Sequence, residues 1–184
     1  MGNLALVNLL DLHPPEGFDP EIAILLAGLV DSQREWLENL GKPSAEAMVW
    51  TERPGGPSIG SQILHMADCE LFWFEQFVGG QPPDADLETR LMTYQIKVEK
   101  GQWPEPPKKP LKWYLELHAE VATRSRQWLQ GVAATHIIQG RTKSITARWV
   151  VSHVMQHDSY HGGQAVLLHE NYKRLRKAAS GPPS

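Results

Sequence analysis

Apolar residues recur every three or four positions along four long stretches of the chain, which is the spacing of amphipathic helices. Asp19 is a good N-cap for the first stretch, Pro20 suits its first helical position, and Gly41 ends it. The second stretch is apolar on nearly every side, which predicts a deeply buried helix. The expected helices span residues 20–40, 58–78, 111–129 and about 144–172. Together they predict an all-α fold, a four-helix bundle.

Turn-forming residues separate these stretches. Residues 81–110 form a long connection between the second and third helices, with a short helix expected within 84–99. Its proline-rich part, 103–110, cannot be regular helix, and connections of this length more often carry function than not. A short hairpin is expected over 135–142, around Gln139 and Gly140. We expect a flexible, frayed tail from about Lys173 onward.

Composition narrows the class of protein. The 184 residues fit one domain, 1–184, with a core of about 18–172. A net charge of −3 argues against a nucleic-acid partner, and no apolar run reaches the length needed to cross a bilayer. The first residues carry no basic leader, so we expect no signal peptide. Cys69 is the single cysteine, which excludes an intrachain disulfide and fits the cytoplasmic location that we expect.

The fourth helix carries the most specific chemical signal. His157 and His161 are four residues apart, so they share one helix face with Val150, Val154 and Leu168. That face points into the bundle, where two polar rings need partners. A divalent metal ion supplies such partners, and a third ligand should come from another helix. His65 of the second helix is the best candidate for that ligand.

Other residues compete for these roles. His118 is the alternative third ligand, and Cys69 is a weaker one, since small buried cysteines are common in plain cores. A hydrogen-bonded core histidine without metal also remains open at this point. His153 is a less favoured candidate ligand, and otherwise we expect it to support the ligands or lie at the surface. The histidines expected to be exposed near ends or turns are His13, His136 and His169.

Two further features of the fourth helix bear on the site. Asp158, not glutamate, follows the first histidine and points off the metal face, which disfavours a zinc protease mechanism. The pair Gly162-Gly163 is costly inside a helix, which predicts close approach of another helix or a ligand.

The pattern His157-x-x-x-His161-x-Gly163-Gln164, preceded by Trp149, resembles the DinB-like (YfiT-like) family. The run from Ile63 to Trp73, which contains His65, is similar to that family's other histidine motif. The resemblance covers the chain from the first helix to about Tyr172. It implies an up-down-down-up bundle, often dimeric, whose three histidines bind zinc or nickel with open positions. By motif match those ligands are again His65, His157 and His161.

The resemblance also implies reaction classes. Some members resemble thiol-dependent S-transferases that use low-molecular-weight thiols, and others look like hydrolases or isomerases. We expect a metal-dependent enzyme acting on a small electrophile by thiol transfer, with hydrolysis as the alternative. Rival hypotheses are a non-catalytic metal-binding bundle and a binder of an apolar ligand, which a large cavity away from the histidines would favour. Candidates for support of the ligands are Asp68, His153, Asp158, Tyr160 and Gln164. The sequence assigns no catalytic base, metal or substrate.

Overall fold

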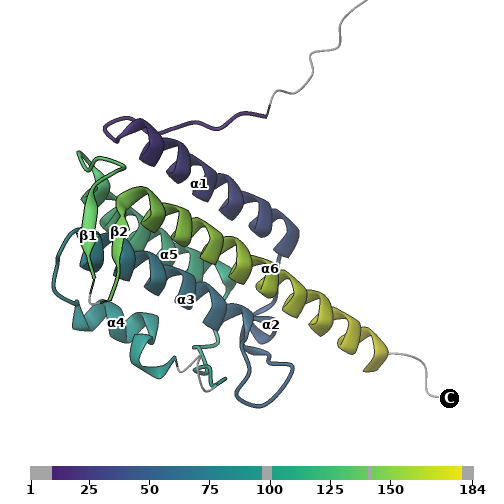
Figure 1. Cartoon of the computed structure of the whole chain (residues 1–184). Coiled ribbons are helices and arrows are strands. Elements are labelled where there is room, and N and C mark those ends of the chain that lie inside the picture. The colour runs from purple at the N-terminus through teal and green to yellow at the C-terminus, as the bar shows by residue number, and fades with distance from the viewer. Residues whose placement is uncertain (1–9, 97–100, 141, 180–184) are drawn as a thin grey trace, which may run out of the picture.

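The fold was analysed in a computed structural model, which describes residues 10–96, 101–140 and 142–179. It is mostly helical, with one small sheet (Figure 1). The long helices are α1 (Pro20–Leu40), α3 (Ile59–Glu70), α5 (Leu111–Arg126) and α6 (Ala147–Ala179). The shorter elements are α2 (Ala45–Val49), η1 (Leu71–Val78), α4 (Ala85–Leu91), η2 (Thr93–Gln95), η4 (Gln127–Leu129), β1 (Ile137–Gln139) and β2 (Ser144–Thr146).

The helix starts follow the capping signals in the sequence. The Asp19 carboxylate accepts a hydrogen bond from the Glu21 amide at the start of α1. Ser58 and Ser61 form a reciprocal capping box at the start of α3. α5 and η4 together cover the expected third helix, and α2, which Ser44 caps, was not expected from the sequence.

The second expected helix changes its winding at Leu71. η1 is a π-helix, in which the Gly79 amide donates to the Phe74 carbonyl five residues earlier. Each π turn takes more residues than an α turn, so the side chains of η1 leave the angular phase of α3. The apolar pattern gave no sign of this change.

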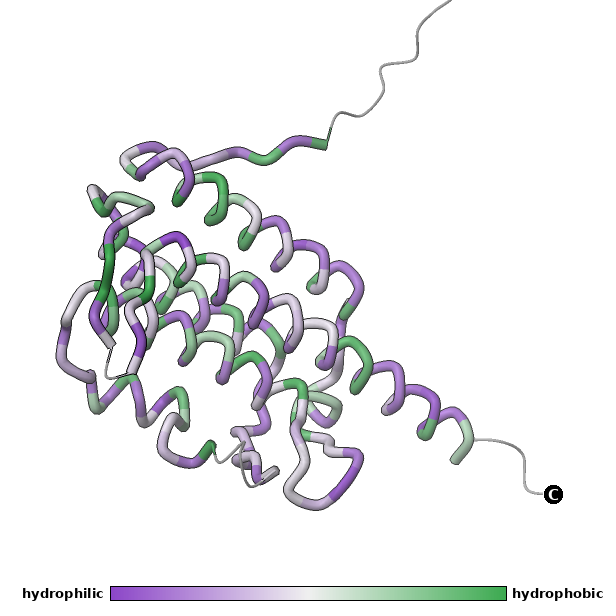
Figure 2. The backbone as a smooth tube through the Cα atoms, viewed as in Figure 1, coloured by the Kyte–Doolittle hydropathy of each residue, from purple (hydrophilic) through white to green (hydrophobic). Residues whose placement is uncertain are grey.

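The fourth expected helix differs at both ends. Residues 144–146 form β2, which pairs antiparallel with β1, so the hairpin lies a few residues later than predicted. α6 then continues to Ala179 instead of ending near residue 172, and residues 180–184 lie outside the described part. Lysine, arginine and alanine near this end are good helix formers, and cations suit a helix C-terminus. The extra turns project beyond the other helices and are largely hydrophilic (Figures 1 and 2).

Side-chain pairs give the relative directions of the long helices. Near the starts of α1 and α6, Arg148 bonds to Glu21, and further along both helices His169 bonds to Leu40. These two helices are therefore parallel. α3 runs opposite to α6. Gln62 bonds to Gln164, and His65, further along α3, meets His157, which lies earlier on α6.

α3 and α5 run in the same direction. Gly60 lies against Tyr114 near their starts, and Glu70 bonds to Arg126 near their ends. Because the two helices point the same way, the chain must return from the end of α3 and η1 to the start of α5. This return explains the long connection between them. α4 and η2 occupy its first part, close to the short helix expected within 84–99, of which 97–100 lie outside the described residues.

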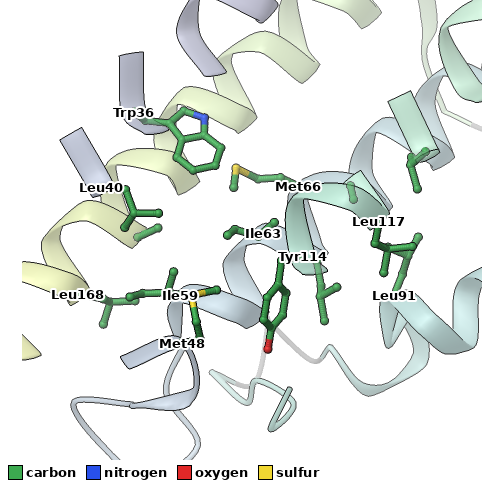
Figure 3. Close-up of a cluster of buried hydrophobic side chains, with 14 of the residues drawn as sticks. Trp36, Leu40, Met48, Ile59, Ile63, Met66, Leu91, Tyr114, Leu117 and Leu168 are labelled. Carbon is green, nitrogen blue, oxygen red and sulfur yellow. The ribbon is translucent and has the colours of Figure 1, made fainter. Parts of the chain in front are cut away.

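The apolar core consists of two clusters that include different parts of α6, its residues 147–154 in one cluster and 165–168 in the other. One lies around Ile63, Tyr114 and Leu168 (Figure 3), and the other lies around Ile22, Phe74 and Val150. The part of α6 between the two clusters, residues 156–164, carries His157 and His161. Within the described residues, no helix combines the length and apolar character that a membrane crossing requires.

Candidate metal centre

Three histidine side chains converge between α3 and α6. On α6, His157 and His161 are one helical turn apart on the same face, and the opposite direction of α3 brings His65 across from them. The Nε2 atoms of His65 and His157 are 3.1 Å apart. One possible ligand atom from each of the three residues lies within 4.8 Å of the others.

Burial keeps these imidazoles neutral. It lowers the pKa of His65 to about 4 and, together with the neighbouring histidines, the pKa of His157 to about 3. Burial also lowers the pKa of His161, against a small opposing effect of Gln164. Neutral imidazoles have lone pairs free for a cation, so the three side chains are in the state that metal ligation needs.

The donor atoms fit a divalent transition metal. Two nitrogens bound to one tetrahedral ion at 2.0–2.1 Å lie roughly 3.3 Å apart, close to the 3.1 Å between His65 and His157. The Nδ1 atom of His65 is buried without a hydrogen-bond partner in the described part of the chain. Hydrogen bonds among the described residues therefore do not satisfy every polar atom of the three histidines.

An amide chain orients the third histidine. The Oε1 atom of Gln164 accepts from Nε2 of Gln62 at 2.7 Å and lies 3.0 Å from Nδ1 of His161. Because an amide oxygen can only accept, Nδ1 of neutral His161 carries the proton and its Nε2 keeps a free lone pair. Gln164, one of the predicted supporting residues, thus contacts His161 and favours this tautomer.

The proline-rich connection contributes a wall to the site. The Trp103 ring packs edge-on against His65 at 5.3 Å and lies 6.0 Å from the His161 ring. The Trp103 amide donates to the Gly55 carbonyl, and further along the Tyr114 hydroxyl donates to the Pro107 carbonyl. These bonds fix the segment against the bundle beside the three histidines.

Aromatic rings border the other side of the site along α6. His153 stacks on Trp149 with ring centroids 4.9 Å apart and planes 6° apart, and its ring is 6.2 Å from that of His157. Trp73 of η1 packs against both Trp149 and His153. His153 therefore extends the site toward the surface and lies outside the three-histidine group.

The other expected supporting residues lie elsewhere. Asp158 is buried on the side of α6 that faces α1, where Trp36 and Gln33 donate to its carboxylate. Asp68 accepts from the Thr93 hydroxyl, and burial raises its pKa to about 6. Tyr160 is largely exposed, and its ring touches His161 only from outside the cluster.

The alternative ligands do not join the cluster. The His118 Nε2 atom lies 3.9 Å from Asp158 and has no hydrogen-bond partner among the described residues. Cys69 is not among the three grouped side chains, and burial raises the pKa of its thiol to about 12, so the thiol is protonated near neutral pH. His13 and His136 are exposed as expected.

One expectation about the histidines was wrong. His169 is buried, because α6 continues past it and its Nδ1 atom meets the Leu40 carbonyl at the end of α1. The sequence also missed two residues at the site. Gln62 precedes His65 by three positions on α3, a spacing that could have suggested it, whereas nothing in the sequence indicates that Trp103 reaches the histidines.

A separate cavity of about 750 Å³ lies between the N-terminal segment and α1, away from the three converging histidines. Leu12, Phe18, Leu26 and Val30 supply apolar walls, and Arg34 and Arg126 lie at its polar side.

The chain was compared with models of protein families. The family model described as the DinB superfamily matches residues 28–165, a range that contains all three converging histidines, Gln62 and Trp103. Comparison with curated proteins gave no match.

Proposed function

Because the chain belongs to the DinB superfamily, we propose that it is a metal-dependent enzyme whose centre is held by His65, His157 and His161. The convergence of three neutral imidazole side chains is the observation that carries this proposal. Zinc and nickel are the ions that the family resemblance favours. We assign the helix directions to an up-down-down-up four-helix bundle, and we expect a cytoplasmic homodimer.

The ligand set decides what chemistry the site can support. Three neutral ligands leave the full dication charge in place, and a divalent ion so held lowers the pKa of a water or thiol at an open position. The pKa values of the three imidazoles are shifted by burial, by the other histidines and by the Gln164 amide. No carboxylate among these groups can act as a general base beside the histidines.

This environment favours thiol transfer over hydrolysis. A thiol needs less help from a base than water does, because its pKa is already closer to neutrality. The protein's own contribution is to hold the three histidines, fix the His161 tautomer through Gln164 and exclude water with Trp103. The proposed reaction is therefore transfer of a low-molecular-weight thiol to a small electrophile, with hydrolysis as the alternative.

The test uses protein loaded with zinc, nickel or cobalt. Each form is incubated with a small thiol and 1-chloro-2,4-dinitrobenzene, and separately with an activated ester, and turnover is measured for wild type and His157→Ala. Thiol transfer by the wild type alone would support the proposal. Ester hydrolysis alone would favour the hydrolase. Stoichiometric metal without either reaction would favour a non-catalytic metal-binding bundle.

The cavity between the N-terminal segment and α1 supports a second candidate function. Its volume of about 750 Å³ suits a small molecule, and its walls are largely apolar. We propose binding of an apolar ligand there as the alternative. A fluorescent apolar probe that binds wild type and loses affinity in Val30→Asp, while His157→Ala binds it unchanged, would favour this function.

A further inference from the structure

A continuous row of aromatic rings runs along α6 through the proposed centre. We call Trp149, His153, His157 and His161 the aromatic row. They are spaced four residues apart, and successive ring centroids are 4.9, 6.2 and 4.4 Å apart. Trp73 of η1 lies beside the first two rings, 5.8 Å from Trp149 and 5.1 Å from His153. The row therefore links the surface to the centre.

The outer end of the row is apolar and open to solvent. Trp149 is 47% exposed, and Phe72, which contacts Trp73, is 45% exposed. Large aromatic side chains gain most from burial, so leaving these two half in water, one on each side of Trp73, gives up stabilisation. A contiguous exposed apolar surface next to a polar centre is typical of a ligand-binding face.

The winding of η1 places its aromatic side chains at this face. Phe72 and Trp73 are the second and third residues of the π-helix, where the chain departs from the phase of α3. π turns are uncommon and occur frequently at functional sites. Trp73 and Phe77, 5.0 Å apart, both belong to this segment. The fold thus keeps a less favourable winding where it gathers aromatic rings beside the row.

The row presents flat rings and no fixed charge. His153 and Trp149 are stacked, with parallel planes 6° apart and centroids 4.9 Å apart, so each ring covers part of one face of the other and the remaining faces and edges are aromatic. An anionic group placed on such a surface would lose hydration without gaining a cationic partner. An aromatic group would gain ring contacts in stacked or edge-on geometry.

We propose that the outer part of the aromatic row, Trp149 and His153 with Trp73, binds an aromatic group of the substrate whose reacting atom lies at the three-histidine centre. Eight residues of helix separate Trp149 from His157, which is about 12 Å along the axis. That length suits one or two rings joined to the reacting atom by a short linker. This inference rests on the proposed function, because it names the substrate class of the same site.

The test compares two ligands of equal size on cobalt-loaded protein. Phenylmethanethiol and cyclohexylmethanethiol differ in the aromaticity of the ring, and binding of either sulfur gives a charge-transfer absorption band. We expect the wild type to bind the aromatic thiol about three- to tenfold more tightly than the cyclohexyl thiol. In Trp149→Leu and His153→Leu, this ratio should fall toward one while cobalt affinity stays within about twofold. Leu175→Ala, which removes an exposed apolar side chain from the far end of α6, is the matched control and should keep the wild-type ratio.

The outcomes separate the two proposals. Failure of wild type to bind cobalt would overturn the proposed function and this inference with it. Cobalt binding with equal affinity for the two thiols would overturn this inference alone. A fall in oligomeric mass of Trp149→Leu by light scattering, with an unchanged thiol ratio, would show that a second copy of the chain covers the row, and would also overturn it.

Discussion

Gln164 follows His161 by three residues on α6 and decides which of the imidazole nitrogens is free. Its carbonyl oxygen holds the proton on Nδ1, so Nε2 keeps the lone pair that a metal ion would use. We expect Gln164→Ala to weaken zinc binding about 10- to 100-fold without unfolding the protein, as loss of a ligand's hydrogen-bond partner usually does. Competition with a chromogenic chelator measures this affinity. Unchanged affinity in a folded variant would remove Gln164 from the site.

Asp68 gives a residue-scale prediction about pH. Burial raises its pKa to about 6 from the ordinary value of 3.8, so the folded protein holds a proton there that the unfolded chain releases between about pH 4 and 6. Stability contributed by this group is therefore present at low pH and lost as pH rises through 6. We expect Asp68→Asn to raise the free energy of unfolding by about 1–3 kcal/mol at pH 7.5 and to change it little at pH 4.

Urea unfolding of both proteins at the two pH values checks this prediction. Zinc affinity serves as the control, because Asp68 bonds to Thr93 and not to a site histidine. An Asp68→Asn protein less stable than wild type at pH 7.5 would contradict the account of a buried, destabilising carboxylate.

At the residue scale, the sequence predicted the histidines whose positions follow from helical spacing. His157 and His161 could be paired because a helix brings residues four apart together, and His65 because its helix is apolar on nearly all sides. Trp103 could not be found, since its position depends on where an irregular segment is fixed by contacts with Gly55 and by the Tyr114–Pro107 bond. His169 was misplaced because the length of α6 was underestimated.

At the scale of elements, α1 and α6 meet through one of the two adjacent glycines. A Cβ atom added at Gly162 would collide with the Trp36 ring, whereas one added at Gly163 would meet nothing within 4 Å. The predicted close approach is therefore confirmed at Gly162, where the neighbour is a helix, and absent at Gly163.

The two glycines form a matched pair for mutation. We expect Gly162→Ala to destabilise the protein by about 1–3 kcal/mol, because the Trp36 ring must move in a packed core. Gly163→Ala should instead stabilise it by up to about 1 kcal/mol, the difference in helix propensity. Thermal unfolding followed by circular dichroism measures both. Equal effects of the two substitutions would contradict the close contact between α1 and α6.

Element boundaries were predicted where capping residues mark them and missed where they do not. Asp19 and Ser58 begin α1 and α3 as expected. The π winding of η1 could not be predicted, because this segment carries apolar residues on nearly every side. Either an α or a π winding would bury some of them. The end of α6 was missed because its basic residues suit both a solvated helix and a loose tail.

On the scale of the whole molecule, a bound ion would link two helices that are far apart in the sequence. His65 comes from α3 and the other two histidines from α6, so an ion bound to all three would favour the folded state over the unfolded chain. We expect zinc at about 100 times its dissociation constant to add about 2.7 kcal/mol to the stability of wild type and nothing to that of His157→Ala. Differential scanning calorimetry with and without zinc makes the comparison, and equal shifts in both proteins would show binding elsewhere.

The all-α fold and the family could be predicted from helix periodicity and two short motifs, and the match over residues 28–165 confirms the family. The pairing of distant elements was less accessible to sequence reasoning. The parallel arrangement of α3 and α5 explains the length of the connection, yet only the folded chain shows that this connection brings Trp103 onto His65.

The most direct test of the metal centre is the metal content of untagged protein purified without chelator, measured by inductively coupled plasma mass spectrometry. His157→Ala is the test variant, and His136→Ala, which removes an exposed histidine, is the control. The account predicts about one zinc or nickel ion per chain in wild type and control, and its loss in His157→Ala. Wild-type protein without metal, even after reloading with zinc or nickel, would contradict the account and leave the three histidines as hydrogen-bonded core residues.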